Sequence, residues 1–355
     1  MRIVIIDTAY PINYRNRKLA DSFSKKRGNE VFVIAWNRES HLKALPNNYY
    51  VFSSKSEYGN KWKKAAKLLG FRRYCISKIQ ELNPSLVIAS HWETLALVPR
   101  LDRSRQKLIY ENLDIPTGNP LERRIASLIE RQELRRVDLT IFASRFFPLV
   151  YPKNLPSFVL ENKPNAGIEP VAKEQTNTLV ISYIGVLRYF EVVKNLIDAV
   201  RNDDRFILYF RGGGDGMKAA MEYSCDAKNI VFTGYYEHSA ISSFYAESDI
   251  VWAVYPSNDF NVKYAISNKF HESLKYGVPC MYANGTKLAE YVMANGIGIG
   301  VDSYDTNQIK DTLIAAYSGQ IQLGTIRKKM LQVGTNMSSW EEDFDKLYTR
   351  ILQLF

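Results

Sequence analysis

The chain has 355 residues, of which 46% are hydrophobic and 24% charged, a composition that excludes a mainly disordered or fibrous protein. The length exceeds what one hydrophobic core normally serves, so two domains are expected. The net charge of +10 lies entirely in the first half, because residues 1–165 hold 29 Lys and Arg against 15 Asp and Glu, whereas the remainder holds 18 against 22.

The first half alternates short apolar runs with polar or amphipathic stretches, a pattern typical of a parallel sheet with crossover helices. Most runs are bounded by Pro, Gly, Asn or Asp, which favour turns. The strands expected here are Arg2–Ile6, Val31–Trp36, Tyr49–Phe52, Ser85–Ser90, Lys107–Glu111, Asp138–Ala143 and Ser157–Leu160.

One helix in this half has a clear periodicity. Within residues 119–136, the apolar residues Leu121, Ile125, Leu128 and Ile129 share one helical stripe, and basic residues occupy the other face. The pattern predicts a surface helix whose apolar stripe packs on the sheet.

A polar stretch, residues 162–177, contains two prolines and a glycine and is the expected linker between domains. The alternation then starts again, so the second half is expected to form a second doubly wound α/β unit rather than a solenoid. Ligands of such units bind at the carboxyl ends of the strands. The strands expected here are Leu179–Ile184, Arg205–Phe210, Asn229–Phe232, Asp249–Tyr255, Val278–Tyr282 and Ile297–Val301.

The segment 179–195, LVISYIGVLRYFEVVKN, places two cations after a buried strand. Arg188 follows the end of the strand at Gly185, and Lys194 lies near the start of the next helix. Both can reach an anion at the strand ends with charge-assisted hydrogen bonds. The alternative is that both are solvated surface cations.

The segment 267–279, SNKFHESLKYGVP, predicts a helix that begins at Ser267 or Asn268 and stops at Gly277. The positive end of its dipole suits a diphosphate. Glu272, about one turn into the helix, suits hydrogen bonding to sugar hydroxyls such as a ribose diol. The alternative is that Glu272 is an exposed helix carboxylate.

Three consecutive glycines, Gly212–Gly214, follow another expected strand. They allow a tight turn with positive φ and the close approach of a ligand, or they serve the turn alone. The spacing is not the dinucleotide-binding fingerprint, and Asp215 would repel a pyrophosphate.

Several of these runs together resemble a known family. The second half, with GVLRYFEVVKN, FRGGGDG, NIVFTGYY, ESDIVWAVYPSN and NKFHESLKYGVPC, resembles the donor domain of GT-B glycosyltransferases, especially the group 1 or family 4-like enzymes related to bacterial lipopolysaccharide and capsule transferases. The first half is similar more loosely, through DTAYPINYRNRKLADSFSKKRGNEVFVIAW, NPSLVIASHWETLAL and VDLTIFAS. The closing SSWEEDFDKLY resembles the terminal helix of that fold.

The resemblance implies a GT-B fold, an α/β architecture of two Rossmann-like, doubly wound domains facing a central cleft. Residues 1–165 would bind the acceptor and residues 166–337 the nucleotide-sugar donor. Residues 338–355 would form a helix that crosses back to the first domain.

Site residues follow from the matched motifs. The resemblance implies that Arg188 and Lys194 bind the donor diphosphate, that Asn268 and Lys269 line the loop around it, and that Glu272 contacts the ribose. The full set expected to bind the donor is Gly185, Arg188, Lys194, Gly212, Thr233, Tyr255, Ser267, Asn268, Lys269 and Glu272.

Two features of the donor stay open. Residues 232–236 resemble the strand and loop beside the base, which leaves UDP- and GDP-linked sugars as alternatives. Many relatives carry a glutamate eight positions before the ribose glutamate, where this chain has Tyr264. This departure leaves both the donor sugar and the choice between retention and inversion undecided.

The expected catalytic residues lie in the first half. His91 follows a strand and would orient the acceptor or the transferred sugar, or it is a structural polar group. Glu93 is a candidate general base or a solvated loop carboxylate, and Asp7 or Asp114, also at strand ends, would serve the same role.

No cofactor and no essential metal are expected. The second half up to residue 337 contains no Asp-x-Asp triplet, and the resemblance implies that cations and a helix end neutralise the leaving diphosphate. The nucleotide sugar is a substrate.

The segment 55–78 combines basic residues with aromatic and aliphatic ones, a mixture that suits an anionic bilayer surface. The alternative is a basic but purely soluble loop and helix. Nucleic acid is not an expected partner, because no nucleic-acid module appears. The residues expected at the membrane or acceptor are Lys61, Trp62, Lys63, Lys64, Arg72 and Arg73.

The localisation expected is cytoplasmic, at the inner face of the cell membrane. The three cysteines have neither metal-knuckle nor redox spacing, the apolar run at the start is too short for a signal peptide, and no run is long enough to span a membrane.

The sequence thus predicts a glycosyltransferase that moves a sugar from a nucleotide-diphosphate donor to a lipid-linked or polysaccharide acceptor in cell-surface polysaccharide biosynthesis. A nucleotide-sugar epimerase of the same fold is one alternative. A non-catalytic partner subunit of a transferase is another.

Overall fold

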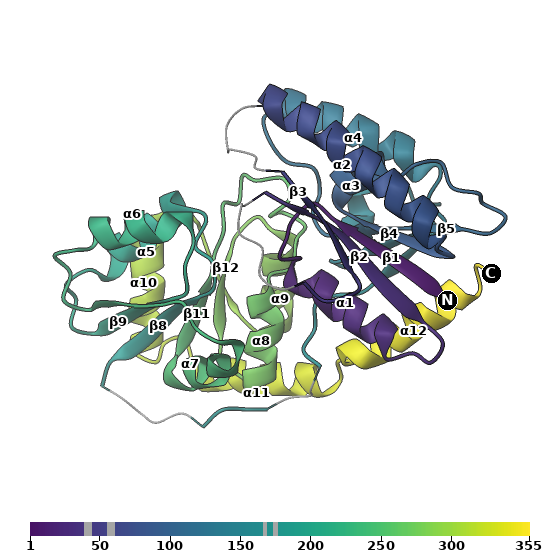
Figure 1. Ribbon diagram of the computed structural model, residues 1–355. Helices are drawn as coiled ribbons and strands as arrows, with labels where there is room; N and C mark the ends of the chain where they lie inside the picture. Colours follow the sequence, from purple (N-terminus) through teal and green to yellow (C-terminus); the bar gives the residue numbers. More distant parts are fainter. Residues whose placement is uncertain (39–44, 55–60, 166–168, 173–176) are drawn as a thin grey trace. The chain divides into compact units, whose positions relative to one another are not determined.

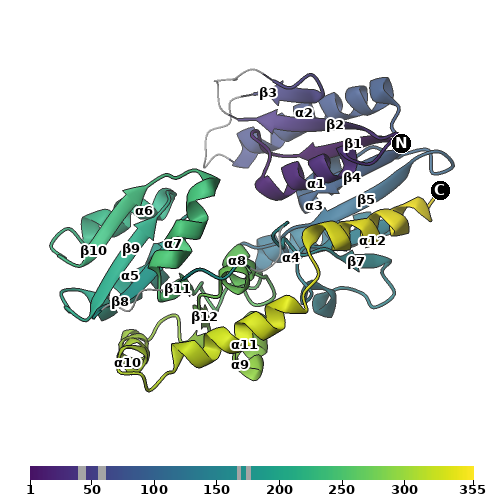
Figure 2. The ribbon, with the colours of Figure 1, turned by 90° about the horizontal axis from the view of Figure 1, so that it is seen from below.

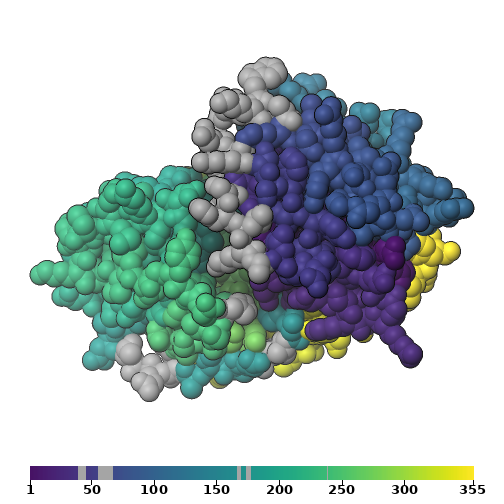
Figure 3. All heavy atoms as spheres, viewed as in Figure 1, coloured from purple at the N-terminus to yellow at the C-terminus, as the bar shows by residue number. Residues whose placement is uncertain are grey.

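The computed structural model describes residues 1–38, 45–54, 61–165, 169–172 and 177–355, and Figures 1 and 3 draw the other residues in grey. The side chains of residues 61–66 and His238 are also outside the description. The chain forms two compact units: unit 1 contains Met1–Glu161 and Glu341–Phe355, and unit 2 contains Asn162–Trp340. The unit boundaries lie close to the expected domain limits at residues 165 and 337.

Unit 1 is built on a seven-stranded parallel sheet with the order β3-β2-β1-β4-β5-β6-β7. All the strands predicted for this half are present. Because helices cover both faces, the central strands are buried along their length, and every residue of β4 is buried. The strands are β1 (Arg2–Asp7), β2 (Glu30–Asn37), β3 (Tyr49–Ser53), β4 (Leu86–Ser90), β5 (Lys107–Asn112), β6 (Leu139–Phe142) and β7 (Ser157–Val159).

The helices of unit 1 divide between the two faces of this sheet. The chain moves outward from β1 to β3 and then returns to β4, so right-handed crossovers place the earlier and later helices on opposite faces. Figure 1 shows α1 and α12 below the sheet and α2, α3 and α4 above it. The helices are α1 (Tyr14–Ser24), α2 (Lys61–Leu82), α3 (His91–Leu97), α4 (Pro120–Leu134), the 3-10 turn η1 (Phe147–Val150) and α12 (Trp340–Leu352).

The last helix, α12, closes unit 1 beside α1. The ring of Phe344 meets that of Phe23 edge to face with centroids 4.9 Å apart, and Lys26 Nζ lies 2.5 Å from Asp345 Oδ1. The chain therefore begins and ends in the same unit.

The apolar stripe of α4 does not pack on the sheet as predicted. It faces outward, and the buried positions of the helix are Ala126, Glu130 and Leu134. The periodicity located the helix but assigned the wrong face to the core. The exposed fractions of the stripe are 67% for Leu121, 50% for Ile125, 58% for Leu128 and 37% for Ile129.

A buried polar network explains the orientation of α4. Glu130 Oε1 accepts hydrogen bonds from Tyr110 Oη at 2.6 Å, Tyr151 Oη at 2.8 Å and Asn112 Nδ2 at 3.2 Å. A buried carboxylate without partners would be costly, so these bonds keep the Glu130 face inward. Burial raises the pKa of Glu130, and the three bonds oppose that rise.

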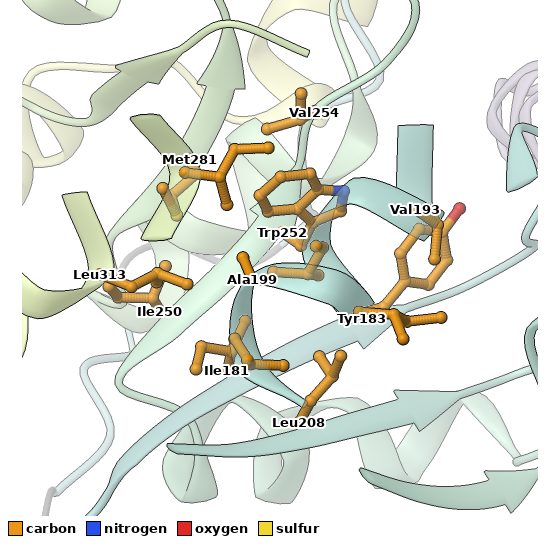
Figure 4. Close-up of a cluster of buried hydrophobic side chains, with 14 of the residues drawn as sticks. Ile181, Tyr183, Val193, Ala199, Leu208, Ile250, Trp252, Val254, Met281 and Leu313 are labelled. Atoms are coloured by element: carbon orange, nitrogen blue, oxygen red, sulfur yellow. The ribbon is translucent and has the colours of Figure 1, made fainter. Parts of the chain in front are cut away.

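Unit 2 contains a six-stranded parallel sheet with the order β10-β9-β8-β11-β12-β13, and all the strands predicted for this half are present. At its core, Trp252 and Met281 lie with residues of several other elements, including Ile181, Leu208 and Leu313 (Figure 4). The strands are β8 (Leu179–Ile184), β9 (Phe206–Arg211), β10 (Ile230–Gly234), β11 (Ile250–Ala253), β12 (Cys280–Ala283) and β13 (Ile299–Val301).

The helices of unit 2 also cover both faces. Figures 1 and 2 show α5, α6 and α10 on one face of the sheet and α7, α8 and α9 on the other. This arrangement follows from the reversal of strand order at β8. The helices are α5 (Phe190–Val200), α6 (Asp215–Tyr223), the 3-10 turn η2 (His238–Ala240), α7 (Ile241–Glu247), α8 (Asn268–Tyr276), α9 (Lys287–Asn295), α10 (Thr306–Tyr317) and α11 (Leu323–Thr335).

Candidate functional site

The carboxyl edge of the unit 2 sheet carries most of the residues predicted to bind the donor. Gly185 follows β8, Gly212 follows β9, Thr233 is near the end of β10, and Tyr255 follows β11 closely. In a parallel sheet these ends share one edge, which is where open α/β sheets bind ligands. We call this edge, with the start of α8, the donor edge.

The glycine turn at the donor edge has a structural role. Gly212 has φ of +136°, and a Cβ there would lie 2.1 Å from the carbonyl oxygen of Gly185. A Cβ on Gly214 would lie 2.6 Å from the carbonyl oxygen of Leu187. Only glycine allows the loops after β8 and β9 to approach so closely. The backbone itself therefore accounts for these glycines without a ligand.

The start of α8 has the capping predicted for it. Ser267 is the N-cap, and its Oγ accepts a hydrogen bond from the Lys269 N–H at 3.3 Å. The helix stops at Gly277, whose φ of +69° is left-handed. The N-terminus of α8 directs the positive end of its dipole to the donor edge. Asn268 Oδ1, in the first turn, accepts a hydrogen bond from Asn162 Nδ2 at 3.0 Å.

A buried cation lies beside this helix start. Lys269 is only 6% exposed, and its Nζ donates to Tyr255 Oη at 2.8 Å and lies 4.4 Å from the centroid of the Tyr183 ring. Burial by itself lowers the pKa of Lys269, but Tyr255, Tyr183 and Glu272 outweigh burial and the pKa is raised. Lys269 is therefore charged, and among the described residues it forms no ion pair with a carboxylate.

Glu272 lies one turn further along α8. Its Oε2 accepts a hydrogen bond from Tyr245 Oη at 3.0 Å, and its side chain is half-buried. Burial raises the pKa of Tyr245 and of Tyr236, and the Glu272 carboxylate raises both further. The carboxylate is thus bound by one neutral tyrosine and lies near a second, and it can accept hydrogen bonds from hydroxyl groups.

The two cations predicted after β8 differ from each other. Arg188 is exposed and makes no ion pair within the described part of the chain. Lys194 Nζ lies 2.7 Å from Asp198 Oδ2 and 4.8 Å from the Tyr223 ring centroid, and Tyr223 Oη donates to the same carboxylate at 2.7 Å. The Asp198 carboxylate raises the pKa of Lys194. Asp198 therefore neutralises part of the charge that Lys194 would offer to a phosphate.

Unit 1 has a second polar edge at the carboxyl ends of its strands. Asp7 is 1% exposed and accepts hydrogen bonds from the N–H of Ala9 at 3.0 Å, the N–H and Nδ2 of Asn13 at 3.4 and 3.1 Å, and Asn16 Nδ2 at 2.7 Å. These contacts fix the loop between β1 and α1. They occupy both carboxylate oxygens of a residue predicted as a general base.

The other predicted catalytic residues begin α3. His91 has a φ of +69°, an uncommon conformation for a residue other than glycine, and its side chain is half-buried. Glu93, also half-buried, lies in the first turn, whereas Asp114 is exposed after β5. Strained backbone persists where the surrounding structure enforces it and is common at functional sites.

The sequence did not reveal a buried ion pair at this edge. Arg15 Nε lies 2.5 Å from Glu111 Oε1, and Arg15 Nη2 donates to the carbonyl of Leu160 at 2.6 Å. Burial raises the pKa of Glu111, against the effect of Arg15 and of nearby His91. A charged residue at the end of an otherwise apolar strand is the one sequence signal that could have indicated Glu111.

The predicted membrane segment is partly corrected. Residues 55–60 lie outside the described residues, and Lys61, Trp62, Lys63 and Lys64 belong to the start of α2 with side chains that are not described. Arg72 and Arg73 are exposed, as a docking role requires. The basic character of this part of α2 is thus available to solvent.

Two aromatic residues of the same segment serve the core instead. Phe71 is fully buried, with its ring stacked on Trp36 at 5.6 Å between centroids, and Tyr74 contacts Phe52 at 5.6 Å. The ring of Phe71 is unavailable to a bilayer because α2 uses it to cover β2 and β3, whereas Tyr74 is half-buried. The expectation that they add apolar burial at a membrane is wrong for Phe71.

Two kinds of feature are absent from the described residues. None of the helices in those ranges has the length and apolar character to cross a bilayer. No group of three or more His, Cys, Asp and Glu side chains in the same ranges is placed to hold a metal ion.

Comparison with known proteins confirms the predicted resemblance. Residues 178–318 match the family model described as Glycosyl transferases group 1. The whole chain has the fold of a sucrose-phosphate synthase from Thermosynechococcus elongatus, with a TM-score of 0.77, 13% identity and 100% of both chains covered. No curated protein sequence gives a significant match.

Two further solved structures share this GT-B fold. HepE from Anabaena in complex with UDP-glucose superimposes with a TM-score of 0.72 and 14% identity, covering 99% of this chain and 100% of HepE. WaaG, a glycosyltransferase involved in lipopolysaccharide biosynthesis, gives a TM-score of 0.69 and 13% identity over 97% of this chain and 98% of WaaG. At these identities the structures establish the fold.

Proposed function

We propose that this chain, a GT-B fold whose residues 178–318 match the group 1 glycosyl transferases, transfers a sugar from a nucleoside diphosphate to a hydroxyl of a lipid-linked or polysaccharide acceptor. The observation that carries the proposal is at the donor edge. Lys269 is buried and charged beside the start of α8, and among the described residues no carboxylate forms an ion pair with it. Such a site is suited to an anion.

The donor edge supplies each interaction that the proposal needs. Lys269, the N-terminus of α8 and the exposed Arg188 would stabilise the charge that develops on the departing diphosphate. Glu272 would accept hydrogen bonds from the ribose hydroxyls. The complexes of HepE with UDP and with UDP-glucose support a nucleotide-sugar donor.

The polar edge of unit 1 would hold the acceptor. A general base there takes the proton from the acceptor hydroxyl as its oxygen bonds to the anomeric carbon and the bond from that carbon to the diphosphate breaks. Both oxygens of Asp7 accept internal hydrogen bonds, which favours a positioning role for Asp7. We assign the orientation of the acceptor to His91, because its backbone is in the left-handed region.

The same proposal includes the cellular location of the reaction and its independence of a metal. The product would enter a cell-surface polysaccharide at the cytoplasmic side of the membrane. The similarity to WaaG, which is involved in lipopolysaccharide biosynthesis, supports the first part of this proposal. The cations and the helix start would neutralise the diphosphate without an essential metal, so activity should persist in excess chelator.

The first test measures donor binding and transfer together. We expect one nucleotide sugar in a panel of UDP- and GDP-linked sugars to raise the melting temperature, and the same donor to label a lipid-linked or polysaccharide acceptor. Lys194→Ala should lower turnover by about tenfold or more, because a charge-assisted bond to phosphate is worth about 1.5–3 kcal/mol. Lys218→Ala is the matched control, since Lys218 also pairs with a carboxylate four residues on, at 3.7 Å.

Three results would argue against the proposal. Conversion of the donor to an isomer without any acceptor would indicate an epimerase. Failure of every nucleotide and nucleotide sugar to bind would indicate a partner subunit without catalysis. Turnover of Lys194→Ala equal to that of the wild type would remove Lys194 from the site.

A further inference from the structure

We propose that Asn162 is a positioning residue of the donor edge, which orients the side chain of Asn268 toward the donor diphosphate. Asn162 is the first residue of unit 2 and begins the segment between β7 and β8. Its Nδ2 donates to Asn268 Oδ1 at 3.0 Å. Asn268 is the first residue of α8, at the helix start that would bind the diphosphate. The role of Asn162 therefore rests on the proposed function of this site.

The hydrogen bond determines which group of Asn268 is left for a ligand. A carboxamide carries one acceptor oxygen and one NH2 donor group. Because Asn162 donates to the oxygen, the NH2 group of Asn268 is the one that remains, and it makes no hydrogen bond within the described part of the chain. The side chain of Asn268 is exposed. Phosphate oxygens accept hydrogen bonds, so the orientation that Asn162 enforces is the one that suits a diphosphate.

The oxygen of the Asn162 side chain supports this role. Asn162 Oδ1 is buried and has no hydrogen-bond partner among the described residues. A buried polar atom without a partner costs free energy, and native proteins contain few of them. An apolar side chain of similar size would avoid that cost. The donor group that Asn268 receives therefore explains why an asparagine occupies this position.

The segment that Asn162 begins also contacts the other end of α8. The N–H of Glu169 donates to the carbonyl of Lys275 at 2.8 Å, and the N–H of Val171 donates to the carbonyl of Tyr276 at 3.1 Å. The described residues of the segment thus contact α8 in its first and its last turn. Coupling between two sites is reciprocal, so a ligand that orders the start of α8 should also order this segment.

The first experiment measures nucleotide affinity in a double-mutant cycle. The probe is UDP or GDP, whichever binds the wild type more tightly, and titration calorimetry on the full chain gives the dissociation constant. Asn162→Ala should weaken binding by about threefold to tenfold, because a neutral hydrogen bond no longer orients Asn268. In the Asn268→Ala protein, the same substitution should change the affinity by less than about twofold, since Asn162 acts through Asn268.

Lys163→Met is the matched control in the same segment. Lys163 Nζ donates to Ser338 Oγ at 2.9 Å, in the second stretch of chain that joins the units. This variant should bind the nucleotide as the wild type does. Asn162→Ser replaces the alanine variant if alanine lowers the melting temperature of the free protein.

Hydrogen–deuterium exchange tests the coupling between the nucleotide and the segment. In the wild type the nucleotide should slow exchange in residues 162–165 by about threefold or more. Asn162→Ala should lose this effect, and Lys163→Met should keep it. A side chain that served the fold alone would change exchange to the same extent with and without the nucleotide.

Three results would overturn the role of Asn162 alone. They are equal affinities of the wild type and Asn162→Ala, an equal loss of affinity with and without the Asn268 side chain, and nucleotide binding that leaves exchange in residues 162–165 unchanged. A wild type that binds neither nucleotide would contradict the proposed function together with this role, so the two failures are distinguishable.

Discussion

The carboxyl edges of the two sheets differ in the partners of their buried charged side chains. In unit 1 the buried charged side chains find partners within the protein: Asp7 accepts four hydrogen bonds from neutral donors, and Arg15 forms a buried ion pair with Glu111. In unit 2 the buried Arg211 pairs with Glu247, whereas the buried Lys269 contacts a hydroxyl and aromatic rings and forms no ion pair with a carboxylate among the described residues. The comparison teaches that Asp7, Arg15 and Glu111 of unit 1 stabilise the fold, whereas the charge of Lys269 in unit 2 is left for an anion.

The largest effect on stability is expected from a variant that breaks the buried ion pair of unit 1. Arg15→Met leaves the Glu111 carboxylate buried with no cation, and a buried charge that loses its partner costs about 3–5 kcal/mol. We expect the free energy of unfolding of unit 1 to fall by about that amount. Denaturant unfolding, followed by a signal from the aromatic core of unit 1, measures it.

The double variant Arg15→Met with Glu111→Leu is the control for this prediction. It removes both charges, and replacement of a buried ion pair by apolar residues is often neutral. We expect it to recover most of the lost stability. An Arg15→Met protein as stable as the wild type would show that the pair contributes nothing, and the contrast between the two edges would fail.

The second prediction tests the unmatched charge in unit 2. Lys269→Met should weaken binding of the nucleoside diphosphate by about tenfold or more, since a hydrogen bond to a charged group is worth about 1.5–3 kcal/mol. The fold should survive, because methionine fills a similar volume among Tyr183 and Tyr255. Titration calorimetry with UDP or GDP measures the affinity.

Lys275→Met is the matched control for this variant. Lys275 lies in the last turn of the same helix, away from its N-terminus, and pairs with Glu169 at 3.2 Å. It should bind the nucleotide as the wild type does. Equal affinities for the two variants would mean that Lys269 belongs to the core alone.

The architecture could be predicted because it is recorded in short-range patterns. Each observed strand of both sheets was expected, and α8 begins and ends where its capping serine and terminal glycine indicated. The face of α4 could not be predicted, because its orientation is set by Glu130 through hydrogen bonds to Tyr110, Asn112 and Tyr151. A hydrophobic period assigns every glutamate to the solvent-exposed face, because it does not depend on hydrogen-bond partners elsewhere in the chain.

Only part of the candidate site could be predicted, again because partners that come from distant segments leave no local pattern in the sequence. Lys269 and Glu272 lie on a helix start that motif and capping both identify, so their place at a strand edge could be anticipated. Tyr183 and Tyr245, which contact them, come from a strand and a helix elsewhere in the chain and carry no local signal. Asp198, the partner of Lys194, lies within reach on the same helix and could have been anticipated from its spacing.

The smallest expected effect concerns the two buried lysines, whose pKa values move in opposite directions. Burial lowers the pKa of Lys18, in α1, to about 7, against the attraction of Glu341, whereas the pKa of Lys269 is raised. In the unfolded chain Lys18 titrates near its ordinary value of about 10.4. Between these two values the unfolded chain binds more protons, so the stability of unit 1 rises with pH.

From pH 6 to pH 8, Lys18 should therefore add about 1 kcal/mol to the free energy of unfolding of unit 1. Below about pH 7 the ammonium is buried in its charged form, and the penalty is present in full. Lys18→Met should remove this contribution, so the difference in stability between the variant and the wild type should shrink as the pH rises. A constant difference across this range would mean that Lys18 stays charged throughout, and that unit 1, like unit 2, tolerates a protonated buried lysine.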